Sequence, residues 1–313
     1  MLCRSRLVVR SGRGGTDAGP GARPAAGRAP SALVHRIVLT HFHPDHSGAT
    51  GWLVQRDRGR PDPEVLMSRG EHEQAMASMR GESGSGAWSA VERLDPHGLP
   101  EATREVLLGA ERPFGALVPD VPDEFVAVAE GERILLGGRE WQVMTGYGHS
   151  PEHVCLYSEG AGEGAGILIS GDMLLPHISS HVGSPVTWTR GNPVALFLES
   201  LRRLAELPAS TLVLPGHGIP FLGVRPRVAA LLEHHQERCA RMLAALDAPQ
   251  TAGDLLEVLF PRGLDPLQVI LAMNETIAHL AYLEEQGELR QAKGADGKVR
   301  WLRTGTRATT QGV

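Results

Sequence analysis

The chain has 313 residues, which allows one large α/β domain and a small additional unit, and it lacks the ~18-residue apolar run that a membrane-spanning helix needs. Its three cysteines (Cys3, Cys155 and Cys239) form no CxxC pair and suggest no disulfide framework, so we expect a reducing, cytoplasmic location. Net charge is -5, but residues 1–34 carry +5 and residues 35–313 carry -10, an acidic balance that disfavours polyanionic partners such as nucleic acid.

Residues 1–34 form an unusual leader, because positions 10–31 consist mainly of Gly, Ala, Pro, Ser and Arg. Such a composition buries too little apolar surface to offset the entropy of ordering it, so we predict a mobile extension or a mis-assigned start. An organelle transit peptide is the alternative, but the leader shows no clear amphipathic helix.

Between residues 35 and 224, apolar strand-like runs alternate with helical ones, which predicts an α/β layered domain. The expected strands are residues 37–40, 65–67, 133–136, 141–144, 154–157, 167–170 and 211–214, and the expected helices are residues 48–58 and 193–206. Gly137 and Gly138 suit the positive φ angles of a tight turn, so the strands beside them should form a hairpin. The polar stretch 71–127 has the weakest core pattern, and we predict a lid-like insertion there.

The pattern changes at residue 225, which predicts a separate C-terminal domain up to residue 307 and a tail over residues 308–313. The expected helices are residues 226–246, 252–260 and 266–286, the second opened by a capping box of Thr251 and Asp254. Two strand-like runs follow, at residues 288–290 and 298–302. This order of two helices and a hairpin resembles a winged helix.

The strongest chemical signal is the run THFHPDH at residues 40–46, directly after an apolar strand. Three histidines and an aspartate within six residues are hard to explain by packing alone. Alternate residues of a turn project together, so His41 and His43 can face one metal ion while Asp45 and His46 face a second. For this segment taken alone, a surface histidine cluster without a metal is the alternative interpretation.

Three further candidate ligands, His149, Asp172 and His217, stand where predicted strands end, each in a turn beside glycine. Taken alone, each has a plainer explanation, since such a histidine is more often a surface residue and such an aspartate a helix cap. Their order along the chain and the total of 14 histidines favour metal binding.

The segments HFHPDH (41–46), GHSPEH (148–153), SGDMLL (170–175) and LPGHG (214–218) resemble, in sequence and order, the metal motifs of the metallo-β-lactamase superfamily. The resemblance covers residues 36–218 and implies a four-layer αβ/βα sandwich with the metal ions at one edge of the two sheets. The implied ligands of the first ion are His41, His43 and His149, those of the second are Asp45, His46 and His217, and Asp172 bridges the two.

Within the superfamily, the aspartate at position 172 is similar to the glyoxalase II and general hydrolase branches, whereas antibiotic-degrading lactamases usually lack it. Redox di-iron relatives place a glutamate where this chain has His43. Relatives usually open with a hairpin and a strand that ends in Asp-x-Gly, a pattern that residues 16–19 match only superficially. We therefore expect the first sheet to lack edge strands.

The resemblance implies two metal ions, which we expect to be zinc, with iron or manganese as alternatives. Two dications that share a water lower its pKa toward neutrality and give a metal-bridged hydroxide as nucleophile. Asp45 is the predicted catalytic residue, because it would orient this hydroxide and move its proton. We predict a metal-dependent hydrolase of a small ester, thioester or lactone, with a small-molecule substrate and no membrane partner.

A metal-dependent single-strand ribonuclease is the alternative function, because residues 287–307 carry a charge of +4 that could contact phosphates. Helix 266–286, however, holds Glu275, Glu284 and Glu285 and no Lys or Arg, so a structural or homodimer contact is the preferred role of the domain. A metal-binding relic without activity is a third interpretation, which the intact ligand set disfavours.

Other polar residues near the motifs are expected to be structural. This class contains the histidines His153, His177 and His181, for which contact with the substrate or with the ligands is the alternative. The cleft could be lined by Tyr147, Trp188 and Arg190, although aromatic residues near strand ends are most often packing residues. His234 and His235 lie on a charged helix, and we predict that they face solvent.

Overall fold

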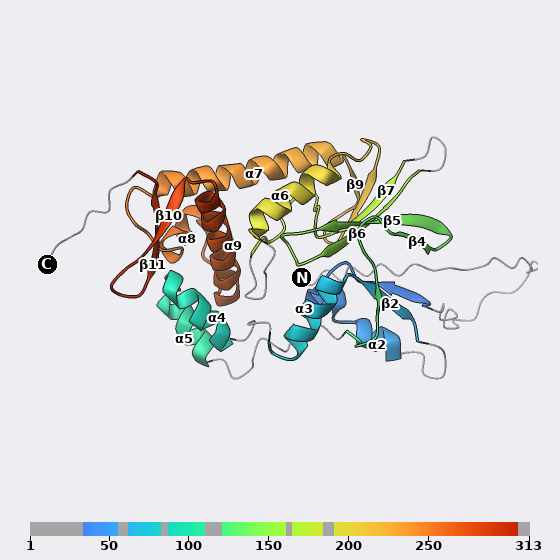
Figure 1. Cartoon of the computed structure of the whole chain (residues 1–313), viewed down its shortest axis with the longest axis horizontal. Coiled ribbons are helices and arrows are strands. Elements are labelled where there is room, and N and C mark those ends of the chain that lie inside the picture. The colour runs from blue at the N-terminus through green and yellow to red at the C-terminus, as the bar shows by residue number, and fades with distance from the viewer. Residues whose placement is uncertain are drawn as a thin grey trace, which may run out of the picture.

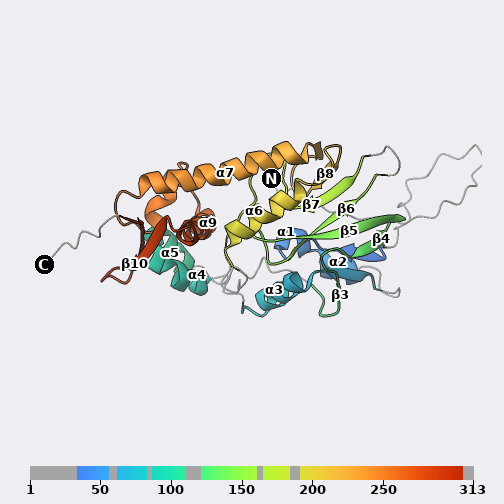
Figure 2. The ribbon, with the colours of Figure 1, turned by 45° about the horizontal axis from the view of Figure 1, so that its top comes forward.

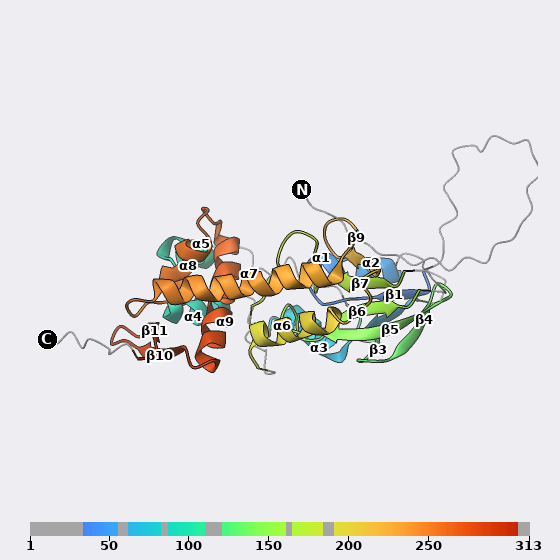
Figure 3. The same cartoon turned by 90° about the horizontal axis from the view of Figure 1, so that it is seen from above.

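The computed structural model describes residues 34–55, 62–82, 87–109, 121–160, 165–183 and 191–305. Two units lie side by side within this part of the chain, and the long helix α7 (Val224–Ala245) runs along both of them (Figures 1 and 3). The N-terminal unit contains both larger sheets, and the C-terminal unit is mostly helical. Over the described residues, no helix is both long and apolar enough to cross a membrane.

A six-stranded sheet forms the centre of the N-terminal unit, and its strands lie beside one another in chain order. They are β4 (Arg133–Leu136), β5 (Arg139–Gly146), β6 (His153–Ser158), β7 (Ile167–Gly171), β8 (Leu212–Pro215) and β9 (Phe221–Leu222). Neighbours are antiparallel except β7 and β8, which are parallel and are connected through α6 (Pro193–Leu204). The predicted hairpin is confirmed: β4 pairs with β5, and Gly137 and Gly138 have φ angles of 60° and 79°.

A smaller parallel sheet consists of β1 (Arg36–Val38), β2 (Glu64–Met67) and β3 (Val126–Ala127), with β1 at one edge. Two short helices, α1 (Pro44–Ser47) and α2 (Thr50–Gln55), follow β1, and α3 (Arg69–Met79) follows β2. The sequence predicted a single helix over residues 48–58. Among the described residues this helix is α2, which begins at Thr50, two residues later than predicted, while residues 56–58 lie outside the described residues. The strand β3 was not predicted because it has only two residues.

Three apolar clusters hold these elements in four layers. Phe197 of α6 packs on one face of the larger sheet, and Val143 on the opposite face packs with Leu66 of the smaller sheet. The neighbouring Met67 points the other way, toward Ala75 of α3, because successive side chains in a strand face opposite sides. The predicted order of helix, sheet, sheet and helix is therefore confirmed (Figure 2).

The C-terminal unit has the predicted sequence of elements. After α7 come η3 (Gly253–Leu255), α8 (Leu256–Leu259), α9 (Pro266–Glu285) and the antiparallel pair β10 (Leu289–Lys293) and β11 (Val299–Arg303). Thr251 and Asp254 exchange the predicted capping hydrogen bonds, and Asp265 forms a further capping box at the start of α9. Trp301 of β11 is buried against these helices.

The lid-like role predicted for residues 71–127 stays a prediction, and part of this stretch lies outside the described residues. Its helices α4 (Ala87–Leu94) and α5 (Glu101–Gly109) pack with α9, and Leu94 and Leu107 are buried in the same core as Trp301. The buried positions of these helices are about one turn apart, Val91 and Leu94 in α4 and Thr103 and Leu107 in α5, and the polar residues between them hid this narrow face. The domain limits 35–224 and 225–307 stay a prediction.

Candidate metal centre

Four of the seven predicted ligands follow directly after β1. The chain is held there by the carbonyl of Thr40, which accepts a hydrogen bond of 2.7 Å from the backbone N–H of Val154 in β6. The Ser47 hydroxyl lies within 2.7 Å of the carbonyl of Phe42 and 3.0 Å of the carbonyl of His43. These contacts fix the turn so that its side chains point toward the edge of the six-stranded sheet.

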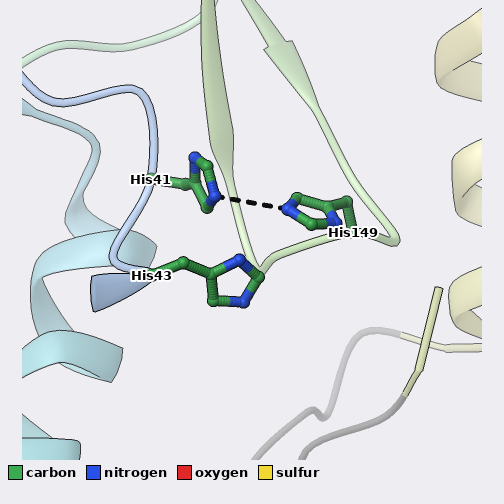
Figure 4. A group of neighbouring side chains, drawn as sticks. All are labelled: His41, His43 and His149. Carbon is green, nitrogen blue, oxygen red and sulfur yellow. Dashed lines mark hydrogen bonds between the residues drawn. The ribbon is translucent and has the colours of Figure 1, made fainter. Parts of the chain in front are cut away.

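His41, His43 and His149 form the first group of candidate ligands, and their rings converge from two loops (Figure 4). The Nε2 atoms of His41 and His149 are 3.2 Å apart. Nδ1 of His149 donates a 2.8 Å hydrogen bond to the carbonyl of His181, because a carbonyl can only accept. The lone pair of His149 Nε2 is therefore free and faces His41, as a metal ligand requires.

Asp45, His46 and His217 form the second group, and they lie at the outer side of the first. The Nε2 atoms of His46 and His217 are 3.2 Å apart, and Nε2 of His217 is 3.2 Å from Asp45 Oδ2. Asp45 is the most exposed of these candidate ligands, with about half of its side-chain surface accessible. This group can therefore be reached from solvent, whereas His41 is fully buried.

Asp172 lies between the two groups, at the end of β7. Its Oδ2 is 3.3 Å from Nε2 of His217 and 3.7 Å from Nε2 of His149, and its Oδ1 is 3.4 Å from Nε2 of His46. The backbone N–H of Asp172 donates a 3.1 Å hydrogen bond to His153 Nε2. One carboxylate thus contacts histidines of both groups, as a bridging ligand does.

A glycine makes room for this carboxylate. Any side chain at Gly216, which directly precedes His217, would collide with Asp172 Oδ1 and would come within 2.9 Å of the His46 ring. The loop after β8 can approach β7 only because position 216 lacks a Cβ atom, and the backbone bond from Gly216 N–H to the Gly171 carbonyl is 2.7 Å long.

The protonation states of the cluster suit metal binding. Burial lowers the pKa of His149 to about 4 and, together with the neighbouring histidines, holds the pKa of His41 and His43 well below the usual value. Burial alone would raise the pKa of Asp172, but the imidazoles of His46 and His149 outweigh burial and lower it. At neutral pH the three histidines are neutral and the carboxylate is ionised, the forms that bind metal ions.

The donor geometry fits a pair of metal ions. Two nitrogens bound at about 2.1 Å to one tetrahedral zinc ion lie about 3.4 Å apart, close to the 3.2 Å separation in each group. Asp172 Oδ1 is buried, and its contact with His46 Nε2 at 3.4 Å is too poorly aligned to satisfy it, so among the described residues it is an acceptor that a bound cation would satisfy. Imidazole and carboxylate donors suit zinc and also iron or manganese.

Two stretches of the chain match models of known protein families. Residues 15–217 match the model described as Metallo-beta-lactamase superfamily. The chain belongs to the metallo-β-lactamase superfamily. It is a metallo-hydrolase. Residues 239–304 match a second model, described as Metallo-beta-lactamase-like, C-terminal domain. The first match begins at residue 15 and so includes the second half of the predicted leader.

Similar proteins match over half of the chain or more. The crystal structure of a beta-lactamase domain protein from Burkholderia ambifaria gives a TM-score of 0.78 at 38% identity, covering 87% of this chain and 76% of that one. A probable metallo-hydrolase, YqjP, of Bacillus subtilis is 27% identical and covers 86% of this chain and 84% of its own length. A hydroxyacylglutathione hydrolase of Idiomarina loihiensis is 29% identical over 50% of this chain and 60% of its own.

Glu71 of α3 is a site residue that the sequence did not reveal. It is fully buried and accepts hydrogen bonds from both ligand loops of the centre. Its Oε2 accepts from the backbone N–H of Phe42 at 2.9 Å, and its Oε1 accepts from the Ser150 hydroxyl at 2.5 Å and the Glu152 N–H at 2.8 Å. One carboxylate therefore ties the loop of His41 to the loop after His149.

Burial raises the pKa of Glu71 to about 7 from its ordinary 4.5, although its three hydrogen bonds oppose the shift. Between these values the folded chain binds more protons than the unfolded chain, so the free energy of unfolding falls as pH rises from about 4.5 to about 7. We expect metal-free wild type to lose roughly 3 kcal/mol relative to Glu71→Gln over this range. Denaturant unfolding at several pH values measures the difference, and a constant difference would contradict the prediction.

The remaining polar residues singled out in the sequence differ in how well the structure agrees with their predicted roles. His153 is fully buried beside the ligands, and its ring stacks on that of His41 with centroids 4.7 Å apart. His177 is exposed. The prediction that His235 faces solvent is wrong: it is only 1% exposed, because α9 supplies His279 as a hydrogen-bond partner at 2.9 Å. Trp188 and Arg190 lie outside the described residues.

Proposed function

We propose that this metallo-hydrolase holds two zinc ions and cleaves a small thioester, ester or lactone. The observation that supports this most is the carboxylate of Asp172, which lies within 3.7 Å of nitrogen atoms from both histidine groups. When bound, such a metal pair supplies Lewis acidity and an activated water at neutral pH. No nucleophilic serine or cysteine is then needed.

The position of each residue in the metal centre indicates its role. The first ion would be held by His41, His43 and His149, the second by Asp45, His46 and His217, and both by Asp172. Asp45 combines a half-exposed carboxylate with a ligand position, so it can orient the attacking water and accept its proton. The buried histidines keep bulk water from the inner side of the centre.

A thioester is our preferred substrate among these carbonyl compounds, because the similar proteins include hydroxyacylglutathione hydrolases. The contacts of the C-terminal hairpin argue against a nuclease. Arg300 pairs with both carboxylate oxygens of Asp296 at 2.8 and 2.7 Å, and Lys298 donates to the carbonyl of Asp95 at 2.7 Å. These cations are already engaged within the chain, which weakens the phosphate-binding surface that the sequence suggested.

Elemental analysis beside a substrate screen tests the proposal. Purified protein should contain about two metal ions per chain and should hydrolyse hydroxyacylglutathione or a related thioester in a chelator-sensitive reaction. Activity only on a lactone or an ester would change the substrate, and cleavage of single-stranded RNA alone would establish the ribonuclease instead. A chain without bound metal would overturn the proposed function. The cytoplasmic location and the homodimer stay predictions.

A further inference from the structure

We propose that the C-terminal unit positions two ligands of the metal centre through a strap (residues 179–181), with Glu275 of α9 as its main anchor. This inference rests on the metal centre proposed above. It assigns a function to the C-terminal unit, because two of its helices contact the strap while the strap contacts the ligands.

The strap holds two candidate ligands by adjacent residues. The Ser180 hydroxyl donates a hydrogen bond to the backbone carbonyl of Asp172, and the carbonyl of His181 accepts from Nδ1 of His149 at 2.8 Å. Asp172 follows β7 and His149 follows β5, so the strap joins the ends of two strands at the metal centre. A displacement of the strap would rotate the His149 ring away from its partner histidines.

The other side of the strap contacts two helices of the C-terminal unit. The Ser179 hydroxyl lies 3.2 Å from Nε2 of His235 on α7, and Nδ1 of His181 lies 3.5 Å from Oε2 of Glu275 on α9. A side chain at Gly183 would collide with the His181 ring and would come within 3.1 Å of Asn274 Cβ. The strap thus lies directly against α9.

The hydrogen bonds from Ser179 to α9 have a defined direction. Nδ1 of His279 must donate to the carbonyl of Glu275 (2.7 Å), which leaves His279 Nε2 as the acceptor from His235 Nδ1 (2.9 Å). Nε2 of His235 is then an acceptor, and the Ser179 hydroxyl, which lies 3.2 Å both from this nitrogen and from the carbonyl of Ser180, shares its proton between the two acceptors. Burial lowers the pKa of both histidines, so both are neutral at pH 7 and the direction is kept.

Glu275 is a buried charge, which packing alone does not explain. It is 8% exposed, and Arg238 of α7 lies 3.0 Å from its Oε1. Burial would raise its pKa, but His181 and Arg238 lower it to about 2, so the carboxylate is ionised at neutral pH. An apolar pair would join two helices at lower cost in desolvation. The charge is therefore better explained by its contact with the strap than by helix packing.

The test compares zinc affinity in three full-length proteins. Wild type, Glu275→Gln and the control Glu284→Gln are stripped of metal, and zinc is titrated in competition with a chromophoric chelator. Glu284 lies on the same helix but contacts Gln291 of β10, so its substitution should leave zinc affinity unchanged. Glu275→Gln removes the charge but keeps the size, and we expect an affinity loss of about tenfold, as for other residues that orient a metal ligand.

Thermal unfolding of the metal-free proteins separates positioning from stability. If Glu275→Gln lowers the Tm but binds zinc as tightly as wild type, Glu275 serves only folding and the inference is overturned. If Glu275→Gln does not fold, Ser179→Ala takes its place, because it removes only one hydroxyl at the strap, and unchanged zinc affinity would again overturn the inference. Wild type that binds no zinc would overturn the proposed metal centre itself, an outcome distinguishable from loss of the strap alone.

Discussion

Asp172→Ala is expected to lower turnover by at least about 1,000-fold, equivalent to ~4 kcal/mol of transition-state stabilisation. The carboxylate lies 3.3 Å from Nε2 of His217 and 3.7 Å from Nε2 of His149, so its removal takes a donor from both groups at once. We expect the metal content to fall below two ions per chain as well. Steady-state hydrolysis of a thioester and elemental analysis of the same sample measure both effects.

Asp296→Ala is the matched control for this prediction. Asp296 is also an aspartate with a depressed pKa, caused by its pairing with Arg300, but it lies on the hairpin of the C-terminal unit. Its loss should leave turnover and metal content unchanged. Near-normal turnover of Asp172→Ala with two bound ions would show that Asp172 is not a ligand.

Glu71→Ala is expected to lower the free energy of unfolding of the metal-free protein by roughly 3 kcal/mol. The change removes the acceptor of three donors in a fully buried site, and each unsatisfied buried donor costs about 1–3 kcal/mol before relaxation. Denaturant unfolding at one fixed pH measures the loss. Because the same carboxylate joins the loops of His41 and His149, zinc affinity should fall too.

Glu73→Ala provides the comparison on the same helix. Glu73 is exposed, so its removal leaves no buried donor and should change stability by less than about 0.5 kcal/mol. Equal stability losses in the two variants would mean that water replaces the Glu71 carboxylate, and the joining role would then be wrong.

The candidate ligands could be predicted because each stands at the end of a strand in a short, distinctive run. His41, His43, Asp45 and His46 follow β1 within six residues, and the three remaining ligands each sit beside a glycine at the end of a later strand. Strand ends at the same edge of a sheet meet in space, so local sequence was enough to bring these residues together.

Residues whose roles depend on distant partners could not be predicted. Glu71 lies in a polar helix, and its partners are 29 and 79 or more positions away in sequence, so nothing local separates it from the exposed Glu73. His235 lies among charged residues, and only the packing of α9 buries it. Likewise Leu94 belongs to a short helix, and the residues of α7, α9 and β11 that bury its apolar face come much later in the chain.

The shared core of α4, α5 and α9 affects how parts of this protein can be exchanged with its relatives. The C-terminal family model covers residues 239–304, but Leu94, Leu99 and Leu107 complete the wall against which Trp301 and Met273 pack. A chimera that replaced residues 239–304 alone would set these leucines against a foreign surface. A working chimera must therefore exchange residues 87–109 together with residues 239–304. These two segments form one packing unit, although the six strands of the larger sheet lie between them in the sequence.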